Sequence, residues 1–168
     1  MEFFYLPWIS TKCTYVRILV KRIVMRKPHL YWAVYCILQD KKWQILLMQR
    51  ANTWYYDWWW SLPAWHVEKG EGPISCLRHE MKEELWITPV EYKFFHVIHR
   101  IDEDREYVDY WFIISWWDWE ITNLEEDKCS ALERFNKNSL PEYITPSAVN
   151  FISMLNEKSK FSEINTTK

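Results

Sequence analysis

The sequence predicts an α/β (α+β) fold in which helices pack on a mixed β-sheet. Apolar runs rich in β-branched and aromatic residues recur along the chain, and helical patterns lie between and after them. Such elements bury their apolar faces by stacking helices on a sheet. A chain of 168 residues is long enough for one domain with its own hydrophobic core.

The first half of the chain predicts two strands and a helix. Residues 31–38 (YWAVYCIL) and 44–50 (QILLMQR) have the composition of strands, and the DKKW turn between them favours a hairpin. Pro63 interrupts the loop that follows. Pro73 suits the first turn of a helix, which we expect to run to about Leu85.

The second half predicts two more strands and a final helix. Residues 90–101 and 105–117 are apolar and aromatic, and the acidic turn DEDR lies between them. Thr145 and Pro146 are typical of a helix start, and this C-terminal helix should reach about Leu155.

The expected domain spans residues 25–156. Residues 1–24 are interpreted either as an N-terminal arm or as a non-native extension; Pro7 and several basic residues interrupt this apolar stretch. It is therefore too broken for a membrane span, and its acidic start does not fit a secretory signal. Residues 157–168 form a polar tail that we expect to be frayed.

Charge and cysteine content exclude several partner classes. The net charge is −2 with interspersed charges, so the sequence predicts neither stable nucleic-acid binding nor a membrane partner. The four cysteines form no CxxC pair, which favours buried thiols in a reducing compartment, and hence a cytoplasmic location.

Glycine and tryptophan are unusually distributed. Average usage gives about 12 glycines in a chain of this length, whereas this sequence has 2 glycines and 13 tryptophans. Several tryptophans lie where turns normally use glycine, in KKWQ, NTWYYDW, PAW, ELWIT and WDWEI. Since glycine provides positive φ or close backbone approach, which tryptophan does not, this pattern indicates systematic replacement of glycine by tryptophan.

The predicted helix 73–85 carries a cluster of acids. Glu80, Glu83 and Glu84 share one face, because residues three and four apart are neighbours on a helix. The stripe facing the core is expected to contain Ile74, Leu77, Met81 and Leu85. Taken alone, this acidic face has two interpretations: a solvated surface, or oxygen ligands for a divalent cation such as Mg²⁺.

The wider stretch resembles the signature of the Nudix hydrolase superfamily, with MutT-like character. Glu71, Glu80, Glu83 and Glu84 occupy its four acidic positions with the spacing intact, and Met81 and Ile87 are apolar where the signature requires it. The lead-in SLPAWHVEKGE and the downstream EEDKCSALERF are also similar to the family, so the resemblance covers roughly residues 28–155. Trp65 and Trp86 stand in place of signature glycines, and His79 in place of its arginine.

This resemblance implies a Nudix-fold α/β/α sandwich that hydrolyses a diphosphate linked to another moiety, with Mg²⁺ or Mn²⁺. Glu80, Glu83 and Glu84 would be metal ligands and catalytic residues, while Glu71 and Glu125 are expected as further ligands. Substrate contacts are expected from Arg50, Arg100 and His66. His96 and His99 are interpreted mainly as structural residues.

Two functions from different classes remain open at this point. One is hydrolysis of a small nucleotide-type substrate; the other is a catalytically impaired Nudix-fold nucleotide-binding module, which the lost glycines favour. The sequence also leaves a homodimer open.

Overall fold

Residues 29–102 and 105–165, the part of the chain described by the computed structural model, form two β-sheets and the helices that pack on them. The N-terminal arm expected at 1–24 lies outside the described residues. In these ranges no helix has both the length and the apolar character needed to cross a membrane.

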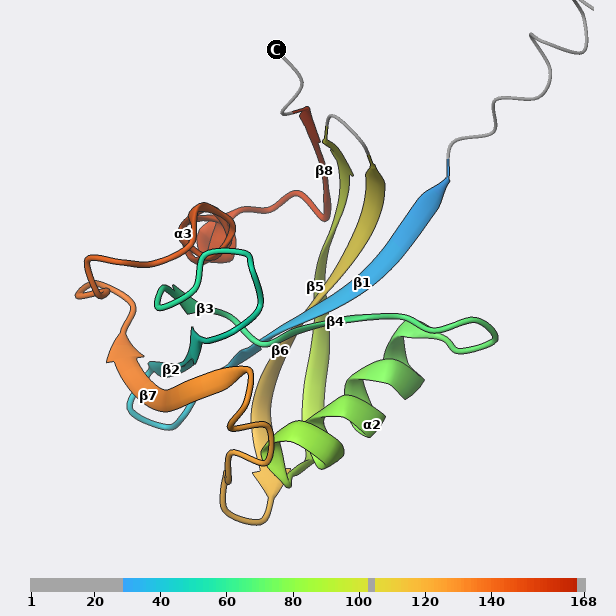
Figure 1. The fold of residues 1–168 in the computed structure, drawn as a ribbon. Coiled ribbons are helices and arrows are strands. Elements are labelled where there is room, and N and C mark those ends of the chain that lie inside the picture. Colours follow the sequence, from blue (N-terminus) through green and yellow to red (C-terminus); the bar gives the residue numbers. More distant parts are fainter. Residues whose placement is uncertain (1–28, 103–104, 166–168) are drawn as a thin grey trace, which may run out of the picture.

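The larger sheet has five strands in the order β4, β1, β6, β5, β8 (Figure 1). Their bounds are Ala64–His66, Leu30–Leu38, Glu106–Asp118, Thr88–Ile101 and Phe161–Asn165. β1 is parallel to β6 and β8 is parallel to β5, whereas β1–β4 and β5–β6 are antiparallel. The predicted mixed sheet is therefore confirmed.

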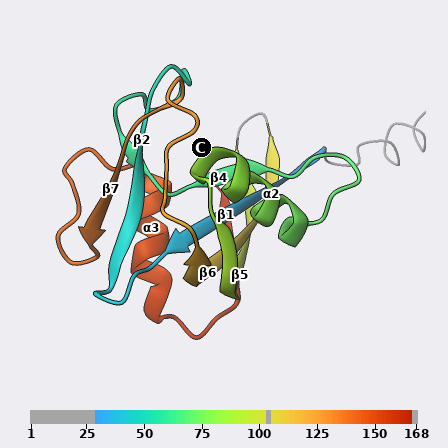
Figure 2. The ribbon, with the colours of Figure 1, turned by 90° about the horizontal axis from the view of Figure 1, so that it is seen from below.

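The smaller sheet has three antiparallel strands in the order β3 (Trp60–Ser61), β2 (Gln44–Arg50) and β7 (Cys129–Asn136). β2 and β7 run side by side next to helix α3 (Figure 2). The sequence interpretation placed no strand at β7, because its pattern, CSALERFN, mixes polar and apolar residues without a clean alternation.

Helices α2 (Pro73–Leu85) and α3 (Pro146–Ser153) pack on opposite faces of the larger sheet (Figure 1). Along β1, Val34 and Cys36 belong to the apolar cluster of α2, whereas Ile37 belongs to that of α3. Successive side chains of a strand point to opposite faces, so one sheet contributes to both clusters. This is the α/β/α sandwich that was predicted.

Both predicted helices are confirmed. α2 begins at Pro73 and ends at Leu85, and α3 continues into a 3₁₀ turn, η1 (Met154–Asn156). One detail of the buried stripe of α2 was wrong: Ile74 is 48% exposed. It lies in the first turn, which extends beyond the central strands (Figure 1), and Cys76 is buried in its place.

Two further expectations were wrong. β1 and β2 do not form a hairpin ladder, because they belong to different sheets that are linked through the isolated bridge of Gln39 with Ile45. β2 diverges because it pairs with β7 and buries Ile45 and Leu47 in the α3 cluster. The tail is not frayed throughout, because residues 161–165 form β8 on the open edge of β5.

Candidate functional site

The three glutamates of α2 line a cleft of about 1500 Å³. Gly72 precedes the helix, Pro73 supplies a preset first turn, and Cys76, Leu77, Met81 and Leu85 fasten it to the sheet. Glu80, Glu83 and Glu84 lie beside this buried stripe and therefore face the cleft rather than the core. The helix thus presents carboxylates at the rim of the sheet, as its periodicity predicted.

Glu125 is brought to the same cleft by a segment that is bonded to the end of α2. The backbone N–H of Thr122 donates to the Leu85 carbonyl at 3.0 Å, and that of Leu124 donates to the Glu84 carbonyl at 2.9 Å. These bonds satisfy carbonyls that a helix C-terminus leaves free. The Asn123 side chain then accepts from the Glu125 backbone N–H, so this carboxylate is held close to Glu84.

The crowding of carboxylates changes their acidity. Burial raises the pKa of Glu84 to about 7, and the neighbouring Glu125 and Glu80 act in the same direction. Burial also raises the pKa of Glu80 above its usual range, with Glu83, Glu71 and Glu125 contributing. A carboxyl that titrates near neutral pH is suited to exchanging a proton with a reacting group.

Trp65 occupies the centre of this site. It lies in β4, is only 6% exposed, and its indole Nε1–H donates to Glu84 Oε2 at 2.7 Å. Trp65 does not have positive φ and belongs to a strand, so its backbone carries no left-handed strain. Its effect is instead chemical, since the indole occupies one oxygen of an expected metal ligand.

His79 and Glu71 form a second contact group beside the helix. His79 Nε2 lies 3.0 Å from Glu83 Oε1, and its Nδ1 lies 3.7 Å from Glu71 Oε1. The hydrogen bond to Glu83 raises the pKa of His79, and the charge of Glu83 adds to this effect. His79 therefore contacts two carboxylates, although it lacks the bidentate fork of an arginine. The side-chain atom Glu71 Oε2 is buried with no hydrogen-bond partner in the described structure.

The chemistry of this donor set fits a divalent cation, since Mg²⁺ and Mn²⁺ take carboxylate oxygens and keep several waters. Two protein groups compete for the same oxygens: the indole N–H of Trp65 binds Glu84, and Lys128 Nζ binds Glu125. Within residues 29–102 and 105–165, no three acidic, histidine or cysteine side chains are grouped to hold a metal. A cation at this site would need these two contacts to release.

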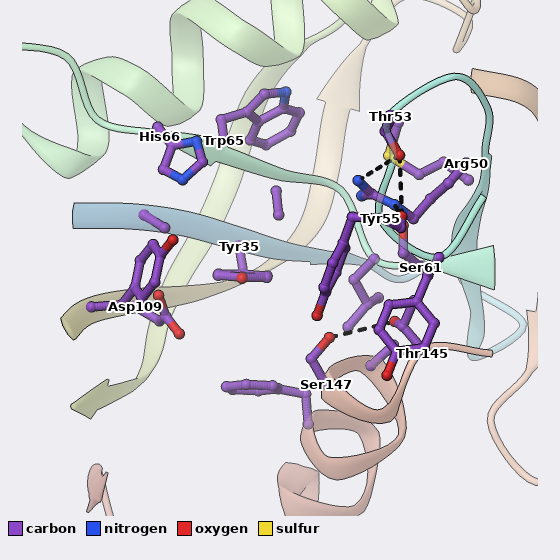
Figure 3. A pocket seen from close by; sticks show the side chains of 18 of the residues that line it. Tyr35, Arg50, Thr53, Tyr55, Ser61, Trp65, His66, Asp109, Thr145 and Ser147 are labelled. Atoms are coloured by element: carbon purple, nitrogen blue, oxygen red, sulfur yellow. Dashed lines mark hydrogen bonds between the residues drawn. The ribbon is translucent and has the colours of Figure 1, made fainter. Parts of the chain in front are cut away.

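The three residues expected to contact the substrate all line the cleft (Figure 3 shows Arg50 and His66). The two arginines among them already bind other protein groups. Arg50 donates to the carbonyl of Tyr55 at 2.7 Å and to the Thr53 hydroxyl at 3.0 Å. Arg100 pairs with Asp109 and Asp102. Both arginines therefore fix the walls of the cleft. His66 is exposed to it.

Several residues of the cleft were not identified in the sequence. They include Tyr35, Asp109 and Lys128. Asp109 lies inside an apolar strand pattern, where a single acid is the signal that could have identified it, because an unpaired acid is costly in a buried strand. His96, by contrast, is fully buried and bonds to the Ser159 carbonyl and the Ser162 hydroxyl, so it is structural as expected. His99 contacts Glu106 at 3.4 Å.

The tryptophan pattern has a clear counterpart in the backbone. Five tryptophans have positive φ, at values from 57° to 73°: Trp43, Trp54, Trp58, Trp86 and Trp119. Trp86 follows α2 in the left-handed conformation that glycine usually adopts after a helix, as predicted. Each of these residues lies in one of the turn motifs in which the sequence suggested a lost glycine.

Comparison with known proteins gives a consistent result. Residues 29–155 match the model of the NUDIX domain family. The chain is 30% identical over 77 residues to an isopentenyl-diphosphate Delta-isomerase of Halobacterium salinarum, and this match spans 36% of that relative. The chain therefore spans about a third of the length of the curated relative.

Solved structures share the fold. A MutT NUDIX hydrolase from Burkholderia pseudomallei is similar with a TM-score of 0.69 and 21% identity, over 76% of this chain and 99% of the other. A MutT protein from Bacillus halodurans is similar with a TM-score of 0.64 and 21% identity, over 82% of this chain and 90% of the other. Because the family match covers the smaller sheet, four strands of the larger sheet, both helices and the glutamates of the cleft, the chain belongs to the NUDIX domain family.

Proposed function

We propose that this chain hydrolyses a phosphoanhydride bond in a nucleoside diphosphate linked to another moiety, with Mg²⁺ or Mn²⁺ held by Glu80, Glu83 and Glu84. The observation that supports this most is that these glutamates and Glu125 line one cleft of about 1500 Å³. Ligand sites of about 300–1,000 Å³ hold molecules of nucleotide size, so the cleft has room for such a substrate.

The roles of the residues follow from their environment. A bound divalent cation would neutralise phosphate charge and lower the pKa of a coordinated water. Burial raises the pKa of Glu84 to about 7 without a cation, and a coordinated cation would lower it, so Glu84 is proposed as a ligand that also positions the attacking water. His79 donates to Glu83 and orients it, while Lys128 holds Glu125. Arg50 and His66 are proposed as substrate contacts at the wall of the cleft.

The test is release of phosphate or pyrophosphate from a panel of nucleotide derivatives with Mg²⁺. We expect turnover of at least one compound, and a loss of roughly a hundredfold or more in Glu83→Gln, which keeps the shape of the side chain but removes its charge. Lys82→Gln is a matched control on the same helix, outside the lining of the cleft. Isopentenyl diphosphate belongs in the panel, because the Halobacterium relative is named for that substrate.

A second candidate function is a nucleotide-binding module with impaired catalysis. It is favoured by Trp65, whose buried indole is hydrogen-bonded to Glu84 in the middle of the site. A folded protein that binds nucleotides but turns over no compound of the panel would support this module and contradict the hydrolase. A homodimer and a cytoplasmic location stay predictions.

A further inference from the structure

Positive φ is concentrated on tryptophan in this chain. Five of the thirteen tryptophans have φ between 57° and 73°, although roughly a few per cent of residues other than glycine have positive φ. Among the residues that the structure describes, the other positive values belong to Gly70, Asn52 and Tyr56. Glycine takes this conformation without steric cost and asparagine tolerates it, whereas a tryptophan is strained by its Cβ.

The left-handed conformation belongs to the turns in which these tryptophans lie. Between β1 and β2, the backbone N–H of Trp43 donates to the Asp40 carbonyl at 3.0 Å. After α2, Trp86 takes the left-handed conformation, and the N–H of the buried Ile87 donates to the Met81 carbonyl at 3.1 Å. These hydrogen bonds join backbone groups only. The fold therefore requires positive φ at these positions whichever side chain they carry.

The five indoles form none of the specific contacts that tryptophans normally form. All five are exposed, at 52% for Trp86, 63% for Trp58, 65% for Trp43, 73% for Trp119 and 99% for Trp54. Within the described part of the chain, none of them forms a ring–ring contact, a cation–π contact or an indole hydrogen bond. Every other described tryptophan forms at least one of these contacts: Trp32, Trp59, Trp60, Trp65, Trp111, Trp116 and Trp117.

Two independent properties thus select the same five residues. Their backbone is in the region that favours glycine, and their exposed side chains bury little apolar surface that could offset the strain. Trp60 differs in both respects, because it lies in β3 without positive φ and its ring packs against Phe135 with centres 4.9 Å apart.

We infer that the protein made in its own cell carries glycine at these five positions and tryptophan at position 60. Glycine has no Cβ, so each turn keeps its backbone conformation and hydrogen bonds without strain. A codon that this cell reads as glycine, and that is otherwise read as tryptophan, produces both the deficit of glycine and the excess of tryptophan in one step.

Tandem mass spectrometry of peptides from the protein isolated from its source cells tests this inference directly. Fragment masses at the five positions should be those of glycine, lower than this sequence predicts by the difference between the two residues. The fragment mass at Trp60 should be that of tryptophan. Tryptophan masses at the five positions would overturn the inference, and a glycine mass at Trp60 would overturn the division of the tryptophans by backbone and packing.

The nucleotide sequence that encodes the chain gives an independent test of the codon. We expect the five positions to share one codon, different from UGG, and Trp60 to be encoded by UGG. If UGG encodes the five positions as well, then the reassigned codon is excluded.

Two variants of the chain with tryptophan test the physical basis of the inference. Trp54 is the most exposed of the five, and Trp54→Gly and Trp54→Ala both remove its indole. Only glycine also removes the Cβ that is strained at a φ of 62°. Trp54→Gly should therefore have a Tm roughly 2 °C or more above that of Trp54→Ala. An equal Tm for the two variants would overturn the claim that the backbone selects glycine at this position.

Discussion

At the scale of single residues, Trp65 decides how available the acidic site is. Its indole donates to Glu84 at 2.7 Å and competes with any cation for that oxygen. Trp65→Phe keeps a buried ring but removes the N–H group. We expect the variant to bind Mn²⁺ roughly tenfold more tightly than the wild-type protein. The cation then no longer has to displace a hydrogen bond to a charged group, which contributes about 1.5 kcal/mol or more.

Calorimetry with Mn²⁺, at a pH well above the pKa of Glu84, measures this effect. The matched control is Trp117→Phe, because Trp117 is a partly buried tryptophan that packs against the same apolar cluster and does not line the cleft. If Trp65→Phe binds Mn²⁺ no better than the wild-type protein, then the indole does not obstruct the site.

The raised pKa of Glu84 has consequences for pH dependence. Its folded-state value of about 7 lies above the ordinary value of 4.5, so the folded protein holds this proton more tightly than the unfolded chain does. The free energy of unfolding should therefore fall as pH rises between these two values, while Mn²⁺ affinity should increase as pH rises through about 7. Thermal melts and calorimetry across this range should show both trends, and Glu84→Gln should flatten them.

His79 gives a second pH dependence. It should make the catalytic activity decrease as pH rises, whereas the affinity for Mn²⁺ increases. The Glu83 carboxylate raises the pKa of His79, and the histidine can orient Glu83 as a charged donor only below that pKa. Activity should thus decline as pH rises through this value. In His79→Arg the decline should disappear, because arginine stays charged. An identical pH-rate profile in both proteins would show that His79 does not orient Glu83.

At the scale of elements, β8 connects the C-terminal segment to the sheet. It pairs with β5 from Val97 to Ile101, and Ser159 and Ser162 provide both bonds to the buried ring of His96. Truncation after residue 158 should lower the free energy of unfolding by about 2 kcal/mol or more, because a buried imidazole loses its partners. Ser162→Ala should lower it by about 1 kcal/mol.

Denaturant unfolding of the truncated chain, the Ser162→Ala variant and the full chain measures this contribution. Ser153→Ala is the control, since the Ser153 hydroxyl bonds to the exposed end of α3 and not to the sheet. A truncated chain as stable as the full chain would mean that β8 adds nothing to the fold.

At the scale of the whole molecule, backbone strain at the five tryptophans with positive φ should lower the free energy of unfolding. A left-handed conformation costs roughly 1–2 kcal/mol for a residue other than glycine, so five such tryptophans cost on the order of 5 kcal/mol. A typical domain has a free energy of unfolding of about 5–15 kcal/mol. Replacing all five with glycine should therefore increase the free energy of unfolding by a few kcal/mol. This net gain is smaller than the strain removed, because glycine loses more conformational entropy on folding.

Denaturant unfolding of the chain with these five replacements gives the size of the effect. Trp116→Gly is the control, because Trp116 is also exposed but lies in β6 without positive φ, and glycine there should be destabilising. A decrease in stability at the five positions as well would show that positive φ is not the cause of the strain.

The sequence by itself determined the elements and the spacing of the acids. Periodicity and proline positions predicted α2 to its end residues, and the i, i+3, i+4 relation placed Glu80, Glu83 and Glu84 on one face. Turn motifs also identified the tryptophans with positive φ, since backbone conformation in a turn depends on neighbouring residues. These features are local, and local sequence is sufficient for them.

Only the tertiary structure decided which distant residues meet. β1 and β2 are adjacent in sequence, yet they join different sheets, because strand pairing depends on the partners available in the whole fold. The indole of Trp65 in β4 donates to Glu84 of α2, nineteen positions away. Asp109 of β6 binds Arg100 of the neighbouring strand β5, and its other oxygen has no hydrogen-bond partner in the described structure. No periodicity encodes these contacts, since they arise from packing between elements that are separated along the chain.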